Sequence, residues 1–310
     1  MEWASATCWL GRRVLVTGAS GFLGGAVARL LLELGAEVHG TGGRRLPPEG
    51  AVLHPMRLPD EAGPVIHAVR PVVVFHLASP VDLRREPGLY LRLREGILDG
   101  TAAVAQGCLE VGARLVHIGT CDEYGAIEAP YRETDAGVPG SPYAALKAAA
   151  SAWVLGLSRY GGLEATVIRP FRGYGPGDQT SVVAQAARAA LAGQPFAMTD
   201  GAQIREWNAV NALAEAIVVA GAHPGALGRV INAGGGERAS VLSVVQTIFR
   251  LAGADPGLVA VGALPRRAGE VERLYGDHGL ARSLWGEIVQ PALEEGLTDT
   301  LDWLATEGSA

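Results

Sequence analysis

Short apolar stretches alternate with amphipathic helical patterns through the first half of the chain. The apolar stretches lie near residues 13–17, 36–40, 72–76, 114–118 and 164–169. Strands that alternate with helices in this way pack into a parallel sheet with helices on both faces. The pattern therefore predicts an α/β protein with a doubly wound parallel sheet of the Rossmann type.

A glycine-rich turn follows the first predicted strand and leads into an apolar-periodic helix over about 22–34. The first glycine permits a tight turn, the second lets the backbone approach a pyrophosphate, and the third lets the helix pack closely on the strand. A lone glycine triplet is more often only a turn, but here strand, turn, helix and a following strand occur together. They predict dinucleotide binding by Gly18, Ser20, Gly21, Phe22, Leu23 and Gly24.

The pattern becomes irregular after residue 173, with Gly/Pro-rich turns and two amphipathic segments over 181–192 and 240–252. We expect a dinucleotide-binding domain over 1–172 and a smaller substrate-binding part over 173–310. A helix and a strand within about 208–235 are expected to return to the main sheet.

Tyr143 and Lys147 stand four residues apart in a predicted helix and so share one of its faces. An ammonium beside a phenol favours phenolate and lowers the tyrosine pKa from its usual value of about 10. Such a pair suits the acid/base step of a carbonyl/alcohol interconversion. The alternative is a packed tyrosine beside a solvated lysine.

The amino-acid composition of the chain argues against several classes of function. A net charge of −6 and a pI near 5.7 argue against nucleic-acid binding. The cysteines Cys8, Cys108 and Cys121 have neither metal-ligand nor disulfide spacing, and no apolar stretch reaches the ~20 residues of a membrane span. We expect a cytoplasmic protein without a metal site, a membrane segment or a signal peptide.

The chain resembles the extended short-chain dehydrogenase/reductase family, in the branch that acts on nucleotide-diphosphate sugars. Besides the glycine turn, the resemblance rests on FHLA at 75–78, GTCDEYG at 119–125, SPYAALK at 141–147, IRPFRGYGPG at 168–177 and RAGE at 267–270. It implies that Leu77 and Ala78 line the cofactor, and that the catalytic residues are Thr120, Tyr143 and Lys147. It also implies a homodimer.

The end of the second strand bears on cofactor choice. Gly42 stands where an acidic residue would bind the adenosine ribose 2′-hydroxyl, and Arg44 and Arg45 follow. Guanidinium groups pair well with a 2′-phosphate, and the run resembles that of NADP-using relatives. We therefore expect NADP(H) rather than NAD(H). The alternative is that the two arginines end a solvated loop.

Substrate contacts are expected from Asp122, Arg172, Arg205 and Arg267. The last two match the positions that clamp the diphosphate in the resembling family, while surface salt bridges are their alternative role. Arg172 replaces a common asparagine and could add a phosphate contact. The family's dehydratases carry an Asp-Glu or Ser-Glu pair where this chain has Cys121 and Asp122. Asp122 could still act as a base, but Cys121 is a poor general acid, so dehydration is expected to be impaired. A solvated loop is the alternative for Asp122 and Glu123.

Three functions stay open. The favoured one is NADPH-dependent reduction of a nucleotide-diphosphate 4-keto-6-deoxyhexose, with Tyr143 as the proton donor. The second is an epimerase or 4,6-dehydratase that works by internal redox and consumes no cofactor. The third is a non-catalytic NADP-binding protein, which the intact Tyr143 and Lys147 disfavour.

Overall fold

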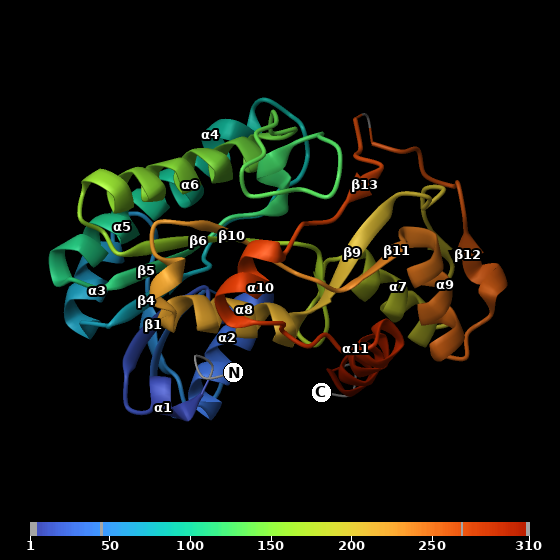
Figure 1. The fold of residues 1–310 in the computed structure, drawn as a ribbon. Coiled ribbons are helices and arrows are strands. Elements are labelled where there is room, and N and C mark those ends of the chain that lie inside the picture. The colour runs from blue at the N-terminus through green and yellow to red at the C-terminus, as the bar shows by residue number, and fades with distance from the viewer. Residues whose placement is uncertain (1–4, 44–45, 268, 308–310) are drawn as a thin grey trace.

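The computed structural model describes residues 5–43, 46–267 and 269–307, and its main body is a sheet with helices on both faces (Figure 1). Seven strands lie in the order β10-β6-β5-β4-β1-β2-β3, and all neighbours are parallel. The predicted doubly wound α/β fold is confirmed. The strands are β1 (Arg13–Thr17), β2 (Glu37–Gly42), β3 (Val52–Pro55), β4 (Val73–His76), β5 (Arg114–Ile118), β6 (Ala165–Pro170) and β10 (Val230–Ala233).

The two faces of the sheet are covered by different helices, because successive strand residues point to opposite faces. Val14 and Val16 of β1 join the core cluster beneath α2 (Phe22–Glu33) and α8 (Val210–Ala222). Leu15, between them, joins the cluster on the other face. That face is covered by α3 (Ala62–Val69), α5 (Gly100–Val111) and α6 (Pro142–Tyr160).

The chain leaves the main sheet after β6 and returns to it. Helix α8 packs beside α2, and β10 pairs in parallel with β6 through Val230–Val167 and Ile231–Ile168. Helix α10 (Gly279–Trp285) also contacts β10. The segment expected to rejoin the sheet therefore lies in it, at the edge beyond β6.

Most of the remaining elements form a smaller sheet with three helices packed beside it (Figure 1). Strand β9 is its centre, and the helices α7, α9 and α11 contact one another around a second core. Its elements are β7 (Gly173–Tyr174), α7 (Val182–Leu191), β9 (Ile204–Ala209), β11 (Glu237–Ser240), α9 (Val241–Leu251), β13 (Arg273–Leu274) and α11 (Leu293–Glu307), with β8 (Phe196–Ala197) pairing β12 (Val259–Ala260) nearby.

Short elements complete the fold. One of them, a π-turn, joins two helices into a continuous helical segment, and the sequence pattern did not indicate the π-turn itself. The short elements are α1 (Ala6–Trp9), α4 (Leu89–Arg94), the π-turn Glu95–Asp99 before α5, and the 3₁₀ turns Cys121–Tyr124, Pro224–Ala226 and Pro256–Leu258. Among the described residues, no helix combines the length and apolar character that crossing a membrane requires.

The glycine turn between β1 and α2 depends on two close approaches. Gly18 has φ of +72°, and a Cβ there would lie 2.9 Å from the backbone nitrogen of Ala78. A Cβ on Gly24 would lie only 2.1 Å from the carbonyl oxygen of Gly18. The backbone therefore fits tightly against itself, and the amide groups of Gly18 and Ala19 are held by Thr41, through its Oγ1 at 3.1 Å and its carbonyl oxygen at 2.8 Å. A compact turn at the start of a helix is what a dinucleotide cradle requires.

Gly24→Ala should weaken binding of a nicotinamide dinucleotide by about 10-fold or more, because the methyl group forces the turn apart. Gly25→Ala is the matched control, since its Cβ would meet nothing nearer than 3.4 Å. Equilibrium titration of both variants measures the effect. Equal affinities would show that the turn does not hold the cofactor.

Candidate active site

The carboxyl ends of β1, β4, β5 and β6 open into one cavity of about 530 Å³. The cavity brings the glycine turn together with the predicted catalytic residues. Its lining includes, of the residues predicted from the sequence, Gly18, Gly21, Phe22, Leu23, Gly24, Leu77, Thr120, Tyr143, Lys147 and Arg172. Ser20 and Ala78 are not among the lining residues, and Arg44 and Arg45 lie outside the described residues.

A buried hydrogen-bond chain fixes the wall of this cavity opposite Gly18. Thr17 Oγ1 accepts from the backbone N–H groups of Leu77 (3.1 Å) and Ala78 (3.0 Å) and lies 2.8 Å from His76 Nδ1. The hydroxyl donates to Nδ1, so the imidazole proton lies on Nε2, which donates to Thr101 Oγ1 (3.2 Å). Burial, with the nearby Lys147, lowers the pKa of His76 to about 3. His76 is thus a neutral structural group.

The glycine turn and this wall fit a nicotinamide dinucleotide. A side chain at Gly18 or Gly24 would collide with the backbone of the wall or of the turn itself, so the turn requires glycine there, and the following helix α2 presents its N-terminus to the same cavity. When bound there, such a cofactor accepts or supplies hydride. The remaining chemistry must come from the side chains.

Tyr143 and Lys147 lie in the first turns of α6. Ser141 caps this helix by accepting from the Ala144 N–H (3.2 Å), and Pro142 occupies its first position. Lys147 Nζ donates to the carbonyl oxygen of Ile118 at the end of β5. The helix start therefore fixes both side chains against the sheet edge.

The electrostatics of this pair differ from the expectation. Burial raises the pKa of Tyr143 above its usual value, the Asp122 carboxylate raises it further, and Arg172 acts in the opposite direction. Burial also lowers the pKa of Lys147 to about 8. The expected lowering of the tyrosine pKa is therefore corrected, because loss of water is the largest influence on the phenol and raises its pKa.

Thr120 is held by the residues that follow it. Its Oγ1 donates to Asp122 Oδ2 (3.2 Å) and accepts from the Asp122 N–H (3.2 Å), while its own N–H donates to Glu123 Oε1 (2.9 Å). Glu123 is buried and pairs with Arg169 at 2.9 Å. The solvated-loop alternative for Asp122 and Glu123 is therefore wrong, since both carboxylates are engaged.

The predicted diphosphate residues gather in an adjoining cavity of about 290 Å³. Arg205 is nearly buried and pairs with Glu270 at 3.2 Å, while Arg267 is exposed at the rim. Arg172 lines both cavities and pairs with Asp122 at 2.8 Å. The four predicted substrate residues thus come together.

Arg85 also lines this second cavity and was missed by the sequence reasoning. It lies on the segment after β4 and donates to the carbonyl oxygen of Gly269 at 2.9 Å. No motif marked it, since a lone arginine in a loop carries no periodicity or spacing.

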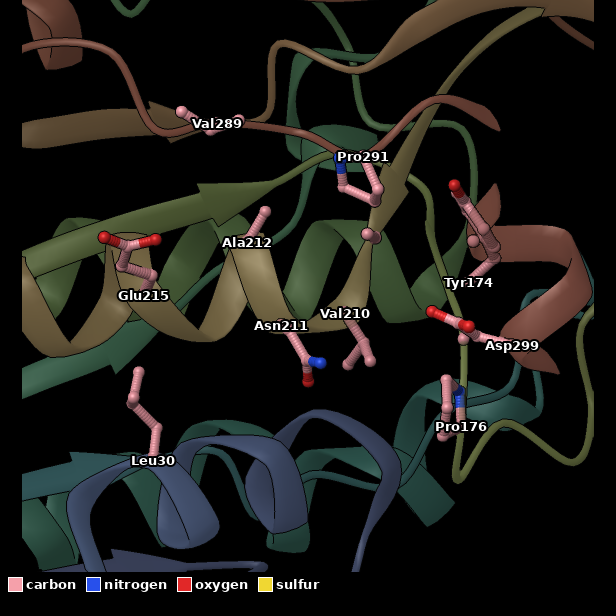
Figure 2. Close-up of a pocket in the computed structure, with 13 residues that line it drawn as sticks. Leu30, Tyr174, Pro176, Val210, Asn211, Ala212, Glu215, Val289, Pro291 and Asp299 are labelled. Atoms are coloured by element: carbon pink, nitrogen blue, oxygen red, sulfur yellow. The ribbon is translucent and has the colours of Figure 1, made fainter. Parts of the chain in front are cut away.

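A third cavity, of about 370 Å³, lies apart from these residues between α2, α8 and α11 (Figure 2). Figure 2 shows Leu30 of α2 facing Asn211 and Glu215 of α8, with Asp299 of α11 at one end. It contains none of the predicted catalytic or substrate residues. We therefore assign the chemistry to the two joined cavities at the sheet edge.

The buried ammonium of Lys147 gives a pH-dependent stability. Its pKa in the folded protein, about 8, lies below the ordinary 10.5, so the unfolded chain binds this proton more tightly. Stability should therefore rise with pH between these values. Relative to Lys147→Met, the wild-type free energy of unfolding should gain about 3 kcal/mol between pH 7 and pH 10.5. Denaturant titrations of both proteins across this range provide the measurement, and a constant difference would contradict it.

Comparison with known proteins gives the family. The family model for the NAD dependent epimerase/dehydratase family matches residues 14–234. A UDP-glucose 4-epimerase of Mycolicibacterium smegmatis is 31% identical, over 94% of this chain and 98% of its own. A UDP-N-acetyl-alpha-D-glucosaminuronate decarboxylase of Bacillus cytotoxicus is 26% identical, over 94% of this chain and 97% of its own.

The fold comparison agrees. The crystal structure of Thermus thermophilus UDP-glucose 4-epimerase in complex with NAD superposes with a TM-score of 0.85 and 27% identity, over 94% of this chain and 99% of that one. One conclusion follows from the glycine turn, from the pair of Tyr143 and Lys147, and from the family match over most of the sheet domain. This chain belongs to the NAD-dependent epimerase/dehydratase family of extended short-chain dehydrogenases/reductases.

Proposed function

We propose that this protein oxidises and re-reduces C4 of a nucleotide-diphosphate hexose, so that its net reaction is 4-epimerisation. The observation that carries the proposal is that the cavity offers one proton-transfer centre at Tyr143, while the neighbouring Asp122 is held in an ion pair with Arg172. One such centre suffices for redox at a single carbon. The relatives named as UDP-glucose 4-epimerases support the same reading.

In the proposed reaction Tyr143 would take the proton of the C4 hydroxyl, and a nicotinamide held between the glycine turn and Lys147 would supply the hydride chemistry at that carbon. Thr120 holds the same oxygen, and Lys147 orients the nicotinamide ribose. For epimerisation the keto sugar would have to present its other face to the same cofactor, and Tyr143 would return the proton to the C4 oxygen. Protons and hydride balance, so no cofactor is consumed.

Dehydration requires more than this site provides. Removing water across C5 and C6 needs a base and an acid beside the sugar. Burial, together with the Asp122 carboxylate, raises the pKa of Cys121 to about 12, so the thiol gives up its proton poorly at neutral pH. Asp122 itself accepts from Arg172 and Thr120. A 4,6-dehydratase is therefore the less favoured form of internal redox.

The diphosphate of the substrate is assigned to the arginine-lined cavity. Arg205 and Arg267 line it together with Arg85 and Arg172, and guanidinium groups bind phosphate oxygens through paired N–H donors. The nucleotide would lie toward Arg267 and the hexose toward Tyr143, because Arg172 lines both cavities.

The second candidate is the NADPH-dependent reduction of a nucleotide-diphosphate 4-keto-6-deoxyhexose. It is favoured by the end of β2 at Gly42, which carries no carboxylate for a ribose 2′-hydroxyl, and by the arginines at 44 and 45 in the sequence. We propose NADP(H) as the preferred cofactor under either reaction. Equilibrium binding of NADPH and NADH tests this, and tighter binding of NADH would reject it.

The reaction itself is tested without added reductant. The protein, loaded with NAD or NADP and freed of excess, should interconvert the C4 epimers of a UDP- or dTDP-linked hexose, as followed by proton NMR of the anomeric signals. Absorbance at 340 nm should show no net change. Stoichiometric loss of NADPH with a 4-keto-6-deoxyhexose substrate, and no interconversion, would replace this proposal by the reductase.

Tyr143→Phe should lower kcat by about 10²- to 10⁴-fold, because the phenol is the only proposed proton carrier for C4. Tyr160→Phe is the matched control, since Tyr160 lies at the end of the same helix and is 85% exposed. The control should retain wild-type turnover. A Tyr143→Phe enzyme with full activity would remove Tyr143 from the mechanism.

A homodimer and a cytoplasmic location are further proposals. Apolar side chains on the outer surfaces of α4 and α6 support the dimer, namely Tyr90, Leu91 and Trp153. Burying them against a second copy would remove apolar surface from water. Light scattering should give the mass of two chains, and a monomer mass would reject the dimer.

A further inference from the structure

The cavity between α2, α8 and α11 carries charge of the opposite sign from the arginine-lined cavity of the candidate site. Glu215 and Asp299 line it, and its described lining residues include no lysine, arginine or histidine. A nucleotide sugar and a dinucleotide both carry negative phosphates, so neither suits a cavity whose charged groups are carboxylates. A ligand of this cavity would therefore differ in charge from the proposed substrate and cofactor.

The two carboxylates lie toward opposite ends of the cavity (Figure 2). The wall includes the apolar side chains of Leu30, Val210 and Ala212. The lining runs along α8 from Val210 to Glu215, which is about 7 Å at a rise of about 1.5 Å per residue. The cavity thus offers two negative groups with apolar surface between them.

Neither carboxylate is neutralised by the part of the chain that the structure describes, where no ion pair involves Glu215 or Asp299. Burial raises the pKa of Glu215, so a cation beside it would offset the cost of its lost water. The described residues also hold no cluster of three or more ligands suited to a metal ion. An organic cation therefore fits these carboxylates better than a metal.

Tyr174 adds a buried hydroxyl at the Asp299 end. The residue is 1% exposed, and a Cβ on Gly296, another lining residue, would lie 2.5 Å from its Oη. Within the described residues this hydroxyl makes no hydrogen bond. Burial, together with carboxylates that include Asp299, raises the pKa of Tyr174 to about 12, so the phenol stays protonated. A buried polar group calls for a partner, and a phenol oxygen can accept from an ammonium N–H.

We propose that this cavity binds a linear aliphatic diamine, with one ammonium group held by Asp299 and Tyr174 and the other by Glu215. Each ammonium has three N–H donors for the carboxylate and phenol oxygens, and hydrogen bonds between charged groups are the stronger ones. The methylene spacer packs on the apolar wall and leaves water. The volume of about 370 Å³ is typical of small-molecule sites.

The ligand would join the two parts of the molecule. Glu215 belongs to α8 on the main sheet, whereas Tyr174 and Asp299 belong to β7 and α11 of the smaller part. Because the two parts are brought together only in the folded chain, the diamine should bind the folded state alone and raise its melting temperature.

Calorimetry with cadaverine, pentylamine and pentanediol tests the site, at an ionic strength near physiological so that exposed charges are screened. Cadaverine should bind at least about 10-fold more tightly than pentylamine, because its second ammonium adds charge-assisted hydrogen bonds. The uncharged diol should not bind. Equal affinities for the diamine and the monoamine, or no binding of either, would overturn the proposal. The titration needs neither cofactor nor sugar, so its outcome is independent of the epimerase proposal.

Variants locate the binding. Glu215→Gln and Asp299→Asn should each weaken cadaverine binding by about 10-fold, and Tyr174→Phe by about 5-fold. Glu295→Gln is the matched control, because it removes the same charge from α11 next to Gly296 but does not line the cavity. It should change the affinity by less than about 2-fold. An equal loss in Glu215→Gln and Glu295→Gln would show only general attraction to an acidic surface and would reject the site.

Discussion

The arrangement of the site depends on one buried carboxylate, that of Glu123. It accepts from the Thr120 N–H (2.9 Å) and from Ser151 Oγ (3.0 Å) on α6, and it pairs with Arg169 (2.9 Å) on β6. Three segments that are distant in sequence are thereby joined at one point. Removing Arg169 would leave the buried charge of Glu123 uncompensated, which is costly. Glu123 therefore sets Thr120 in register with the helix that carries Tyr143.

The same constraint extends to the far edge of the sheet. The Arg169 guanidinium lies 4.4 Å from the centre of the Tyr124 ring, and Tyr124 Oη donates to Asn232 Oδ1 (2.6 Å) on β10. The returning strand is thus connected to the reacting region by polar contacts as well as by sheet pairing. Against this fixed frame, the Asp122 and Arg172 pair acts on the pKa of Tyr143 with opposite signs, so the pair's net influence on the phenol is small compared with burial.

The sequence alone was sufficient to predict the features of the fold that depend on the local spacing of residues. The alternating apolar segments predicted the parallel sheet, and the glycine turn predicted the close approach of Gly18 and Gly24. The family resemblance supplied Thr120 and the arginines, which spacing alone does not connect. The pairing of Asp122 with Arg172 spans fifty positions and depends on how β6 ends beside β5, so no local pattern reveals it. Burial likewise decided the pKa of Tyr143, and a sequence does not state how much water a side chain loses.

The return of α8 and β10 to the main sheet means that the chain crosses between the two sheets repeatedly. The smaller sheet is therefore not a terminal module that a gene fusion could append or a truncation remove intact. Cutting the chain after β6 would strip the main sheet of its edge strand and of a helix on one face. A change of substrate preference should consequently come from point changes in the residues that line the two joined cavities, rather than from exchange of whole segments.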